Sequence, residues 1–311
     1  MSEIKYSHYP VMLNEAVDAL NCRDGKLYID ATLGGGSYSE LILKRIQPNG
    51  RLIAFDVDID AVNASKEKLK QYKNLTIVND SYTNIKKFLQ ENNVTEITGG
   101  VVFDLGASYP QLTSDTRGFS FSKDAKLDMR FNQSADFSAY DIINSYKEAD
   151  LVRIFSEYGE ERFSKRIAKK ITEDRRKKPI ETTKELSGLI INATPRIKST
   201  IHPATRVFQA LRIEVNNELR NIKNTLDDIL TLLSFDAILS VVTFHSLEDR
   251  IVKQFFKYHA SKCNCTREAV ICNCPLPRLE IITKKPITAT QREIVENTSS
   301  RSAKLRIARK I

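Results

Sequence analysis

Short apolar runs alternate with longer amphipathic segments along the first third of the chain. Apolar runs bounded by polar or glycine residues predict buried strands, and apolar side chains that recur every three or four positions predict helices. By this pattern, strands are expected at 27–31, 52–56, 75–78 and 100–105, and helices at 38–46, 59–72 and 85–92. The alternation predicts an α/β fold in which helices cover a parallel sheet and right-handed crossovers join its strands.

This pattern breaks after about residue 112, where a turn-rich stretch gives way to charged helical segments. We interpret residues 113–205 as an inserted, mostly helical domain. Residues 1–112 and 206–311 then form the first and second parts of the main domain.

The second part of the main domain begins with a long apolar periodicity. Apolar residues recur with a spacing near that of a helix turn from Val207 to Leu233, which predicts one continuous helix. Another helix is expected at 246–262, where Ser246 and Asp249 have the spacing of a capping box. The remaining strands are expected at 237–244, 279–282 and 304–308.

A glycine-rich turn directly follows the first expected strand. It contains Gly34, Gly35 and Gly36, and Asp56 closes the second strand about 20 positions later. Glycines allow a ligand to approach the backbone, and a carboxylate at the tip of the second strand accepts hydrogen bonds from ribose hydroxyls. A dinucleotide fingerprint has a third glycine where this chain has Ser39, so the pattern favours S-adenosylmethionine over NAD. The alternative is a tight turn without a ligand.

The segment after the fourth strand contains the expected reaction centre. Its Ser-Tyr-Pro sequence resembles the motif of a polar residue and a proline with which amino-methyltransferases hold an exocyclic amine. The lone pair of such an amine is delocalised into the base, so the site must surround its N–H groups with acceptors. Asp104 and Ser108 are expected to do so beside Pro110. In the alternative interpretation, Gly106 and Pro110 only shape the exit from the strand.

Two further observations bear on which atom of the base is methylated and which residue could assist. Methylation of a pyrimidine at carbon 5 generally uses a cysteine nucleophile, and no cysteine lies near Asp104 in the sequence. Direct transfer to nitrogen is therefore favoured. His245 follows the strand at 237–244, where it either contacts the base or accepts a proton, or simply precedes the next helix.

Four of the five cysteines fall within a short segment of the chain. Cys263, Cys265, Cys272 and Cys274 offer enough thiols for a tetrahedral metal site, although the spacing is not a standard one. Zinc ligands and reduced thiols both remain open, and no metal ligand is assigned. Crowded in this way, the cysteines do not form the framework of a secreted disulfide protein.

An excess of positive charge favours a polyanionic partner. The chain has 48 Lys and Arg against 39 Asp and Glu, with a formal net charge of +9. Basic residues gather at 165–170 and 175–178, and Arg117, Phe119 and Phe121 add cationic and aromatic groups suited to RNA. The alternative is an ordinary solvated face.

Neither a membrane span nor a signal region is evident. The apolar stretch from Ala237 to Phe244 is far shorter than a span, and the first residues are polar. We therefore expect a cytoplasmic protein that does not bind a membrane.

Taken together, these motifs resemble those of the ribosomal RNA small subunit methyltransferase H family. The resemblance is nearly full length, and the motifs follow one another in the family's order. They lie at 8–13, 30–36, 104–112, 117–121, 127–130, 158–161, 204–212, 244–250 and 301–306. The resemblance implies a Rossmann-like domain with a helical insertion that uses S-adenosylmethionine to methylate N4 of a cytidine in the decoding region of 16S ribosomal RNA. It implies as partner this RNA or the assembling small subunit, and not DNA.

Carried over position by position, the family's cofactor contacts fall on eight residues. These are Gly34, Gly36, Ser37, Tyr38, Asp56, Tyr82, Asp104 and Gln111. The family has Gly-His where this chain has Ser37 and Tyr38, Phe in place of Tyr82, and Ser in place of Tyr109. Tyr82 keeps an aromatic face for adenine, and the loop at Ser37 keeps its backbone N–H groups.

Two competing functions remain at this stage. One is an amino-methyltransferase that acts on DNA or protein, and the other is a catalytically silent RNA-binding assembly factor. The presence of Asp104, Ser108 and Pro110 argues against a silent protein.

Overall fold

The computed structural model describes residues 10–195, 202–263, 265 and 274–311. The chain divides into two compact units, one formed by residues 1–106 and 219–311 and the other by residues 107–218. The boundaries expected for the insertion, 113 and 205, both fall inside the second unit. No helix in the described parts is both long enough and apolar enough to span a membrane.

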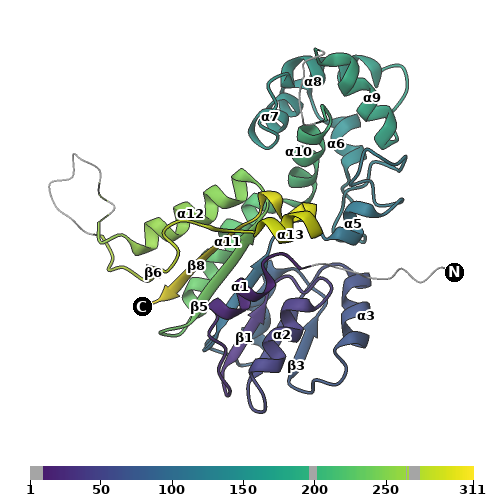
Figure 1. Ribbon diagram of the computed structural model, residues 1–311. Coiled ribbons are helices and arrows are strands. Elements are labelled where there is room, and N and C mark those ends of the chain that lie inside the picture. The colour runs from purple at the N-terminus through teal and green to yellow at the C-terminus, as the bar shows by residue number, and fades with distance from the viewer. Residues whose placement is uncertain (1–9, 196–201, 264, 266–273) are drawn as a thin grey trace. The chain divides into compact units, whose positions relative to one another are not determined.

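The first unit is built on an eight-stranded sheet with the order β3-β2-β1-β4-β5-β8-β6, and β7 also pairs with β8 (Figure 1). Strands β1 to β5 are parallel, whereas β8 runs antiparallel to β5, β6 and β7. The strands are β1 (Leu27–Asp30), β2 (Arg51–Phe55), β3 (Leu75–Val78), β4 (Gly100–Asp104), β5 (Ile238–Thr243), β6 (Leu279–Ile281), β7 (Ile287–Thr288) and β8 (Lys304–Lys310). This arrangement confirms the predicted Rossmann-like α/β fold.

Helices cover both faces of this sheet. Alternate strand residues point to opposite faces, so Ile29 and Ile53 join a core with α4, α11 and α12, while Tyr28 and Leu52 join another with α1 and α2. The helices of this unit are α1 (Leu13–Ala19), α2 (Ser37–Arg45), α3 (Ile59–Lys68), η1 (Tyr82–Asn84), α4 (Ile85–Glu91), α11 (Glu218–Leu232), α12 (Ser246–Ala260), α13 (Gln291–Glu296) and η2 (Thr298–Ser302). Both faces are thus buried, which explains the nearly continuous apolar strands.

The second unit is helical and has a core of its own. Apolar residues of α6 to α10 form this core, with Phe155 and Leu211 fully buried in it. Its helices are α5 (Tyr109–Thr113), α6 (Ala139–Ser145), α7 (Glu148–Glu157), α8 (Ser164–Asp174), α9 (Thr183–Ala193) and α10 (Thr205–Asn216). The expected helical character of the insertion is therefore confirmed.

Two local predictions were wrong. The helix expected from Val207 to Leu233 is broken at Asn217, which adopts a left-handed conformation (φ 51°) between α10 and α11. The helix at 246 is capped one residue earlier than expected, because the backbone N–H of His245 donates to Glu248. Asp249 instead forms an ion pair with Arg306 of β8 at 2.6 Å.

Candidate functional site

The glycine turn after β1 and the carboxylate after β2 lie in direct contact. The backbone N–H of Gly34 donates to Oδ2 of Asp56 at 2.8 Å, and the N–H of Asp58 donates to Oδ1 at 2.9 Å. Burial raises the pKa of Asp56 to about 6, although both hydrogen bonds act to lower it. The site therefore fixes the orientation of a carboxyl group that titrates near neutral pH.

Gly36 has a conformation and surroundings that suit glycine alone. Its φ of +71° places it in the left-handed region at the start of α2. A Cβ atom there would lie 3.0 Å from Oγ of Ser65 and 3.1 Å from Cδ1 of Leu69. Ser65 in turn donates to the carbonyl of Gly34 at 2.8 Å, so α3 holds the turn from behind.

Two more carboxyl groups lie at the ends of β1 and β4. Asp30 accepts hydrogen bonds from Oγ of Ser39 at 2.7 Å and from the N–H of Thr32 at 3.2 Å, and burial raises its pKa to about 6. Oγ1 of Thr32 accepts the backbone N–H of Asp104 at 2.7 Å. Thr32, in the loop after β1, thus links the carboxyl group of Asp30 to the backbone of Asp104 at the end of β4.

Asp104 is the most perturbed of these acidic groups. Its Oδ1 atom is buried and has no hydrogen-bond partner among the described residues. Burial raises the pKa of Asp104 well above its ordinary value, and the nearby charges of Asp30 and Glu248 raise it further. An unpaired buried carboxyl group is costly, so this position favours a ligand that brings positive charge or a hydrogen-bond donor.

The end of β5 brings the candidate His245 together with Glu248, which the sequence patterns did not single out as a site residue. Glu248 is fully buried and accepts the backbone N–H groups of Phe244 at 2.8 Å and His245 at 3.2 Å. Nε2 of His245 lies 3.1 Å from Oε1 of Glu248. A Cβ atom on Gly106 would be 3.6 Å from the ring of Phe244. The sequence signal for Glu248 was its place in the motif at 244–250.

Two aromatic residues carried over from the family lie in different environments. Tyr38 is buried in the core, its hydroxyl donates to the carbonyl of Val11, and burial raises the pKa of that hydroxyl. Only its backbone, in the first turn of α2 with that of Ser37, is therefore placed to meet a ligand. Tyr82 directly follows the loop after β3, and its ring packs edge-on against Phe103 at 5.8 Å.

The predicted reaction segment begins the second unit. The backbone N–H of Ser108 donates to Oε1 of Gln111 at 2.9 Å, which closes the first turn of α5. Pro110 lies in that first turn, where a missing N–H breaks no helix bond. Oγ of Ser108 is buried and has no hydrogen-bond partner among the described residues. Gln111 thus has a structural contact besides the cofactor role expected for it.

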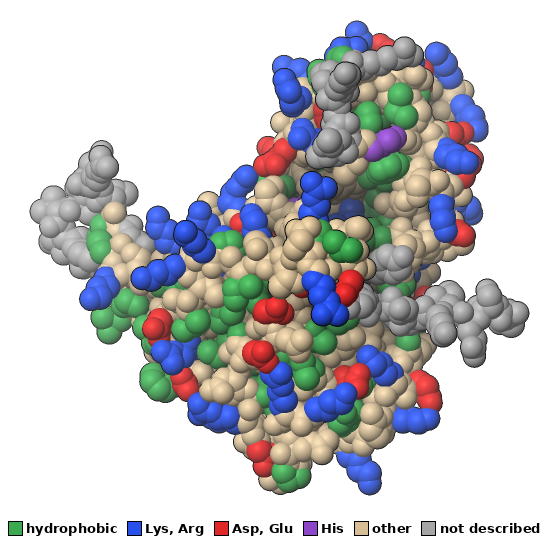
Figure 2. Space-filling model, viewed as in Figure 1, with side chains coloured by type: hydrophobic (Ala, Val, Ile, Leu, Met, Phe, Trp, Pro, Cys, Tyr) green, Lys and Arg blue, Asp and Glu red, His purple; other side chains and the backbone are tan. Residues whose placement is uncertain are grey.

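Basic side chains of α8 face away from the core of the second unit. Lys165, Arg166 and Lys169 are exposed, whereas the opposite side of the helix is buried. Figure 2 shows Lys and Arg side chains on the visible surface of this unit, with acidic side chains among them. Arg175 differs, because its guanidinium donates to the carbonyls of Ile143 and Tyr146, both at 2.6 Å. It is a structural residue rather than part of an exposed basic face.

The aromatic residues expected to contact RNA are largely internal. Phe119 is buried in the core of the second unit and stacks on Phe131 with 5.6 Å between ring centres. Arg117 is also buried and donates to the carbonyl of Phe131 at 3.1 Å. Phe121 stacks on His202 at 4.3 Å. The expectation that Arg117 and Phe119 offer a cationic and an aromatic group to RNA is therefore wrong, since both side chains are buried.

Comparisons with known proteins extend over nearly the whole chain. A model of the MraW methylase family matches residues 5–311. The ribosomal RNA small subunit methyltransferase H of Caldicellulosiruptor bescii is 48% identical over 307 residues, which cover 98% of this chain and 100% of that protein. The protein of the same name from Clostridium botulinum is 47% identical over 310 residues, covering 99% and 100%. A solved rRNA methylase structure from Streptococcus thermophilus has 9% identity and a TM-score of 0.44, covering 98% of this chain and 99% of that one.

Proposed function

The chain belongs to the MraW methylase family, and we propose that the residues at the carboxyl ends of β1, β2 and β4 carry its reaction. The protein is an S-adenosylmethionine-dependent methyltransferase that modifies N4 of a cytidine in 16S ribosomal RNA. When bound, S-adenosylmethionine supplies the methyl group. The proposal assigns the work of binding and orientation to particular side chains.

The buried Oδ1 of Asp104 is the observation that carries this proposal. Asp30, Asp56 and Asp104 occupy the ends of neighbouring parallel strands, the edge at which such sheets bind ligands. S-adenosylmethionine carries a sulfonium and an amino group, and this positive charge compensates the ionised form of Asp104. In the free protein this positive charge is absent, and burial raises the pKa of Asp104.

The remaining cofactor contacts follow from the local geometry. Asp56 already accepts one backbone N–H on each oxygen, and a carboxylate oxygen has a second lone pair to accept a ribose hydroxyl. Gly34 and Gly36 allow close approach of the backbone, and Ser37 and Tyr38 contribute N–H groups at the start of α2. We assign the adenine to the face of Tyr82, and a further contact to Gln111.

Ser108 and Pro110 are assigned to the target amine. Bound S-adenosylmethionine would supply the methyl group to N4, and the proton that N4 gives up in exchange would pass to water, while Ser108 and Pro110 would hold the amine. An acceptor that holds the N–H groups favours this step because it lets the nitrogen become pyramidal. Oγ of Ser108 is a suitable acceptor, since it is buried and makes no hydrogen bond to a described residue.

We assign RNA docking to the inserted unit. The exposed basic face of α8, defined here by Lys165, Arg166 and Lys169, is suited to the phosphate backbone of folded RNA. The partner is the assembling small subunit or its RNA, and the site of action is the cytoplasm. Neither DNA nor a membrane is expected as a partner.

Mapping the methylated cytidines of small-subunit RNA by mass spectrometry tests this function. Cells without the gene are expected to lack one N4 methyl group, and the wild-type gene should restore it while Asp104→Ala does not. The purified protein should methylate small-subunit RNA but not DNA or protein. Unchanged RNA modification in cells without the gene would contradict the proposal.

A further inference from the structure

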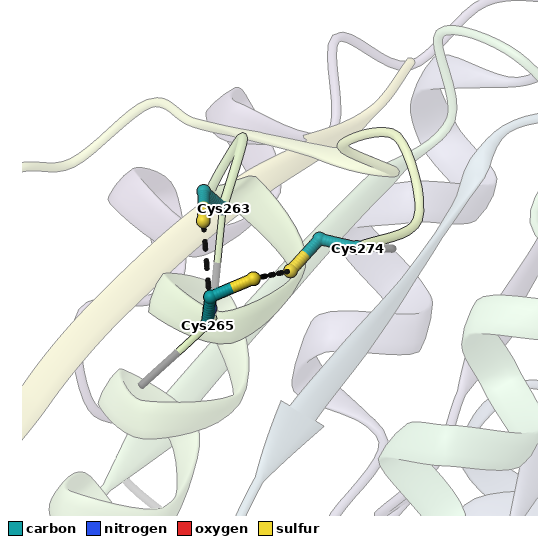
Figure 3. A group of neighbouring side chains, drawn as sticks. All are labelled: Cys263, Cys265 and Cys274. Carbon is teal, nitrogen blue, oxygen red and sulfur yellow. Dashed lines mark hydrogen bonds between the residues drawn. The ribbon is translucent and has the colours of Figure 1, made fainter. Parts of the chain in front are cut away.

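Three cysteines come together in the connection between α12 and β6 (Figure 3). Cys263 and Cys265 follow the end of α12, and Cys274 precedes β6. Their three sulfur atoms lie within 4.8 Å of one another, and those of Cys265 and Cys274 are 3.4 Å apart. The fourth cysteine of this segment, Cys272, lies outside the described residues.

These distances suit a shared metal ion better than a covalent bond. The sulfurs of a disulfide are about 2.05 Å apart, much closer than those of Cys265 and Cys274. Zinc binds thiolates at about 2.3 Å, so two thiolates on one tetrahedral ion lie about 3.8 Å apart. We propose that Cys263, Cys265 and Cys274 bind one zinc ion.

A pocket with several basic residues lies between α12 and β6, the two elements that the cysteine-containing connection joins. Lys253, Lys257 and Lys262 line a pocket of about 500 Å³ between α12 and β6, and Lys262 directly precedes Cys263. Figure 2 shows basic side chains gathered on this side of the unit, over α12. Zinc binding releases the thiol protons, and three thiolates on Zn²⁺ leave one net negative charge. Lys262, directly before Cys263, is the lysine placed to compensate this charge.

The sheet topology places this zinc site away from the proposed reaction centre, so its role is structural. Leu279, the first residue of β6, pairs with Lys310 near the end of β8, and Ile238 at the start of β5 pairs with the adjacent Arg309. The connection therefore lies toward the amino ends of the parallel strands, opposite the edge that carries Asp104. The metal joins the end of α12 to the start of β6, and it takes no part in methyl transfer.

The fifth cysteine supplies a matched control. Burial raises the pKa of Cys22 to about 11, so this thiol stays protonated at neutral pH, and it lies in the connection between α1 and β1. Cys22→Ser removes one thiol and leaves the cluster intact. The metal content of Cys22→Ser therefore shows whether a loss of zinc is specific to the cluster or follows from the loss of any cysteine.

The test measures metal in the full-length protein, purified with a reductant and without a chelator. Elemental analysis should find about one zinc ion per chain in the wild type and in Cys22→Ser. Cys263→Ser, Cys265→Ser and Cys274→Ser should each lose most of it. Cobalt substitution should give thiolate-to-cobalt charge transfer and the d–d absorption of a tetrahedral site, both absent from the three cluster variants.

Circular dichroism and S-adenosylmethionine affinity serve as folding controls, and both should match the wild type in the three variants. Absence of zinc after reconstitution of protein with fully reduced thiols would overturn the proposal. So would retention of zinc in all three variants, or a disulfide between Cys265 and Cys274 in the native protein. None of these outcomes depends on methyltransferase activity, so the site and the proposed reaction are tested separately.

Discussion

The acidic edge of the sheet and the basic face of α8 hold their charges in opposite ways. Asp30 and Asp56 are fixed by hydrogen bonds from nearby loops, and burial raises the pKa of each to about 6. Lys165 and Arg166 extend into solvent and form no ion pair with a described residue. Under the proposed function, a few fixed groups bind the small cationic cofactor, whereas exposed and distributed charges bind RNA. Single substitutions should therefore have large effects at the edge and small ones on the helix.

The largest effect is expected from Gly36→Ala. A side chain in the left-handed region costs about 1–2 kcal/mol, and the contacts with Ser65 and Leu69 add about 1–3 kcal/mol of crowding. Gly25→Ala is the matched control, because its φ of +72° is nearly the same and nothing lies within 4 Å of the added Cβ. Urea denaturation should show the larger loss of unfolding free energy in Gly36→Ala. Equal losses would mean that the turn has room for a side chain.

Removal of the carboxylate after β2 is expected to act on the cofactor. Asp56→Ala should weaken S-adenosylmethionine binding by about 1.5–3 kcal/mol, the range for a hydrogen bond to a charged group, or roughly 10- to 100-fold. Calorimetric titration measures this change. Asp60→Ala, which removes an exposed carboxylate at the start of α3, should bind as the wild type does. Unchanged affinity in Asp56→Ala would remove it from the cofactor site.

Acidification should weaken cofactor binding through the same edge. The ionised form of Asp56 accepts the ribose hydroxyls, and its pKa in the free protein is about 6. Binding lowers this pKa, so the cofactor releases protons, and affinity falls as pH falls through about 6. The affinity can fall by at most about tenfold per pH unit for each proton that binding releases.

Calorimetry in buffers of different ionisation enthalpy counts the protons released. The fall in affinity should be shallower in Asp56→Asn, which has no proton to lose at this position. A pH-independent affinity between pH 5 and 7, with no proton release, would show that the acidic edge is not coupled to the cofactor.

A smaller effect is expected at Ser108, which belongs to neither the acidic edge nor the basic face. Ser108→Ala keeps the backbone N–H that donates to Gln111 and removes only the hydroxyl at the N-cap of α5. Loss of one acceptor to the amine should slow single-turnover methylation by about tenfold with cofactor saturated. Ser122→Ala removes an exposed hydroxyl of the same unit and should react normally. If the rate in Ser108→Ala equals that of the wild type, Ser108 is structural.

The smallest effect per residue is expected on α8. Reversal of Lys165 and Arg166 to Glu should reduce the salt dependence of RNA binding, by about 0.7–0.9 in slope for each phosphate that is no longer neutralised. Cofactor affinity should not change. Lys87→Glu, an exposed position on α4, is the control, whereas Arg175 is unsuitable because it holds two backbone carbonyls. An identical slope in the reversed variant would place the RNA-binding surface elsewhere.

Sequence periodicity predicted the sheet well and one helix boundary badly. Strands β1, β4 and β5 form continuous apolar runs because both faces of the sheet are buried there, whereas the two-residue strand β7 was not predicted. The break at Asn217 was missed because the apolar spacing continues from α10 into α11. Asparagine tolerates the left-handed conformation, so the clue lay in one residue and not in the pattern.

Sequence patterns predicted which residues lie close together where neighbouring strands end, and they misjudged side chains whose place is decided by burial. The proximity of Gly34 and Asp56 follows from adjacent parallel strands, and their hydrogen bond has that origin. The contact of Thr32 with Asp104, by contrast, depends on how a loop folds over the next strand. Phe119 was predicted to face RNA because it is aromatic and lies close to Arg117 in the sequence. Its ring is buried, and the fold, not the residue type, decides whether a ring lies inside a core.

The position of α11 has a consequence for how such a protein can change over time. This helix packs in the core between β4 and β5 in the chain, so it completes the crossover between these strands by itself. Residues 107–217 interrupt that crossover, and those of them that the structure describes contribute no strand to the sheet. Under the proposed function, replacing them would change RNA docking and remove Ser108 and Pro110, while keeping the strands of the sheet, the glycine turn and the acidic residues after β1, β2 and β4. The segment inserted into this crossover also carries Ser108 and Pro110, so under the proposed function it supplies groups for the target amine as well as a surface for RNA.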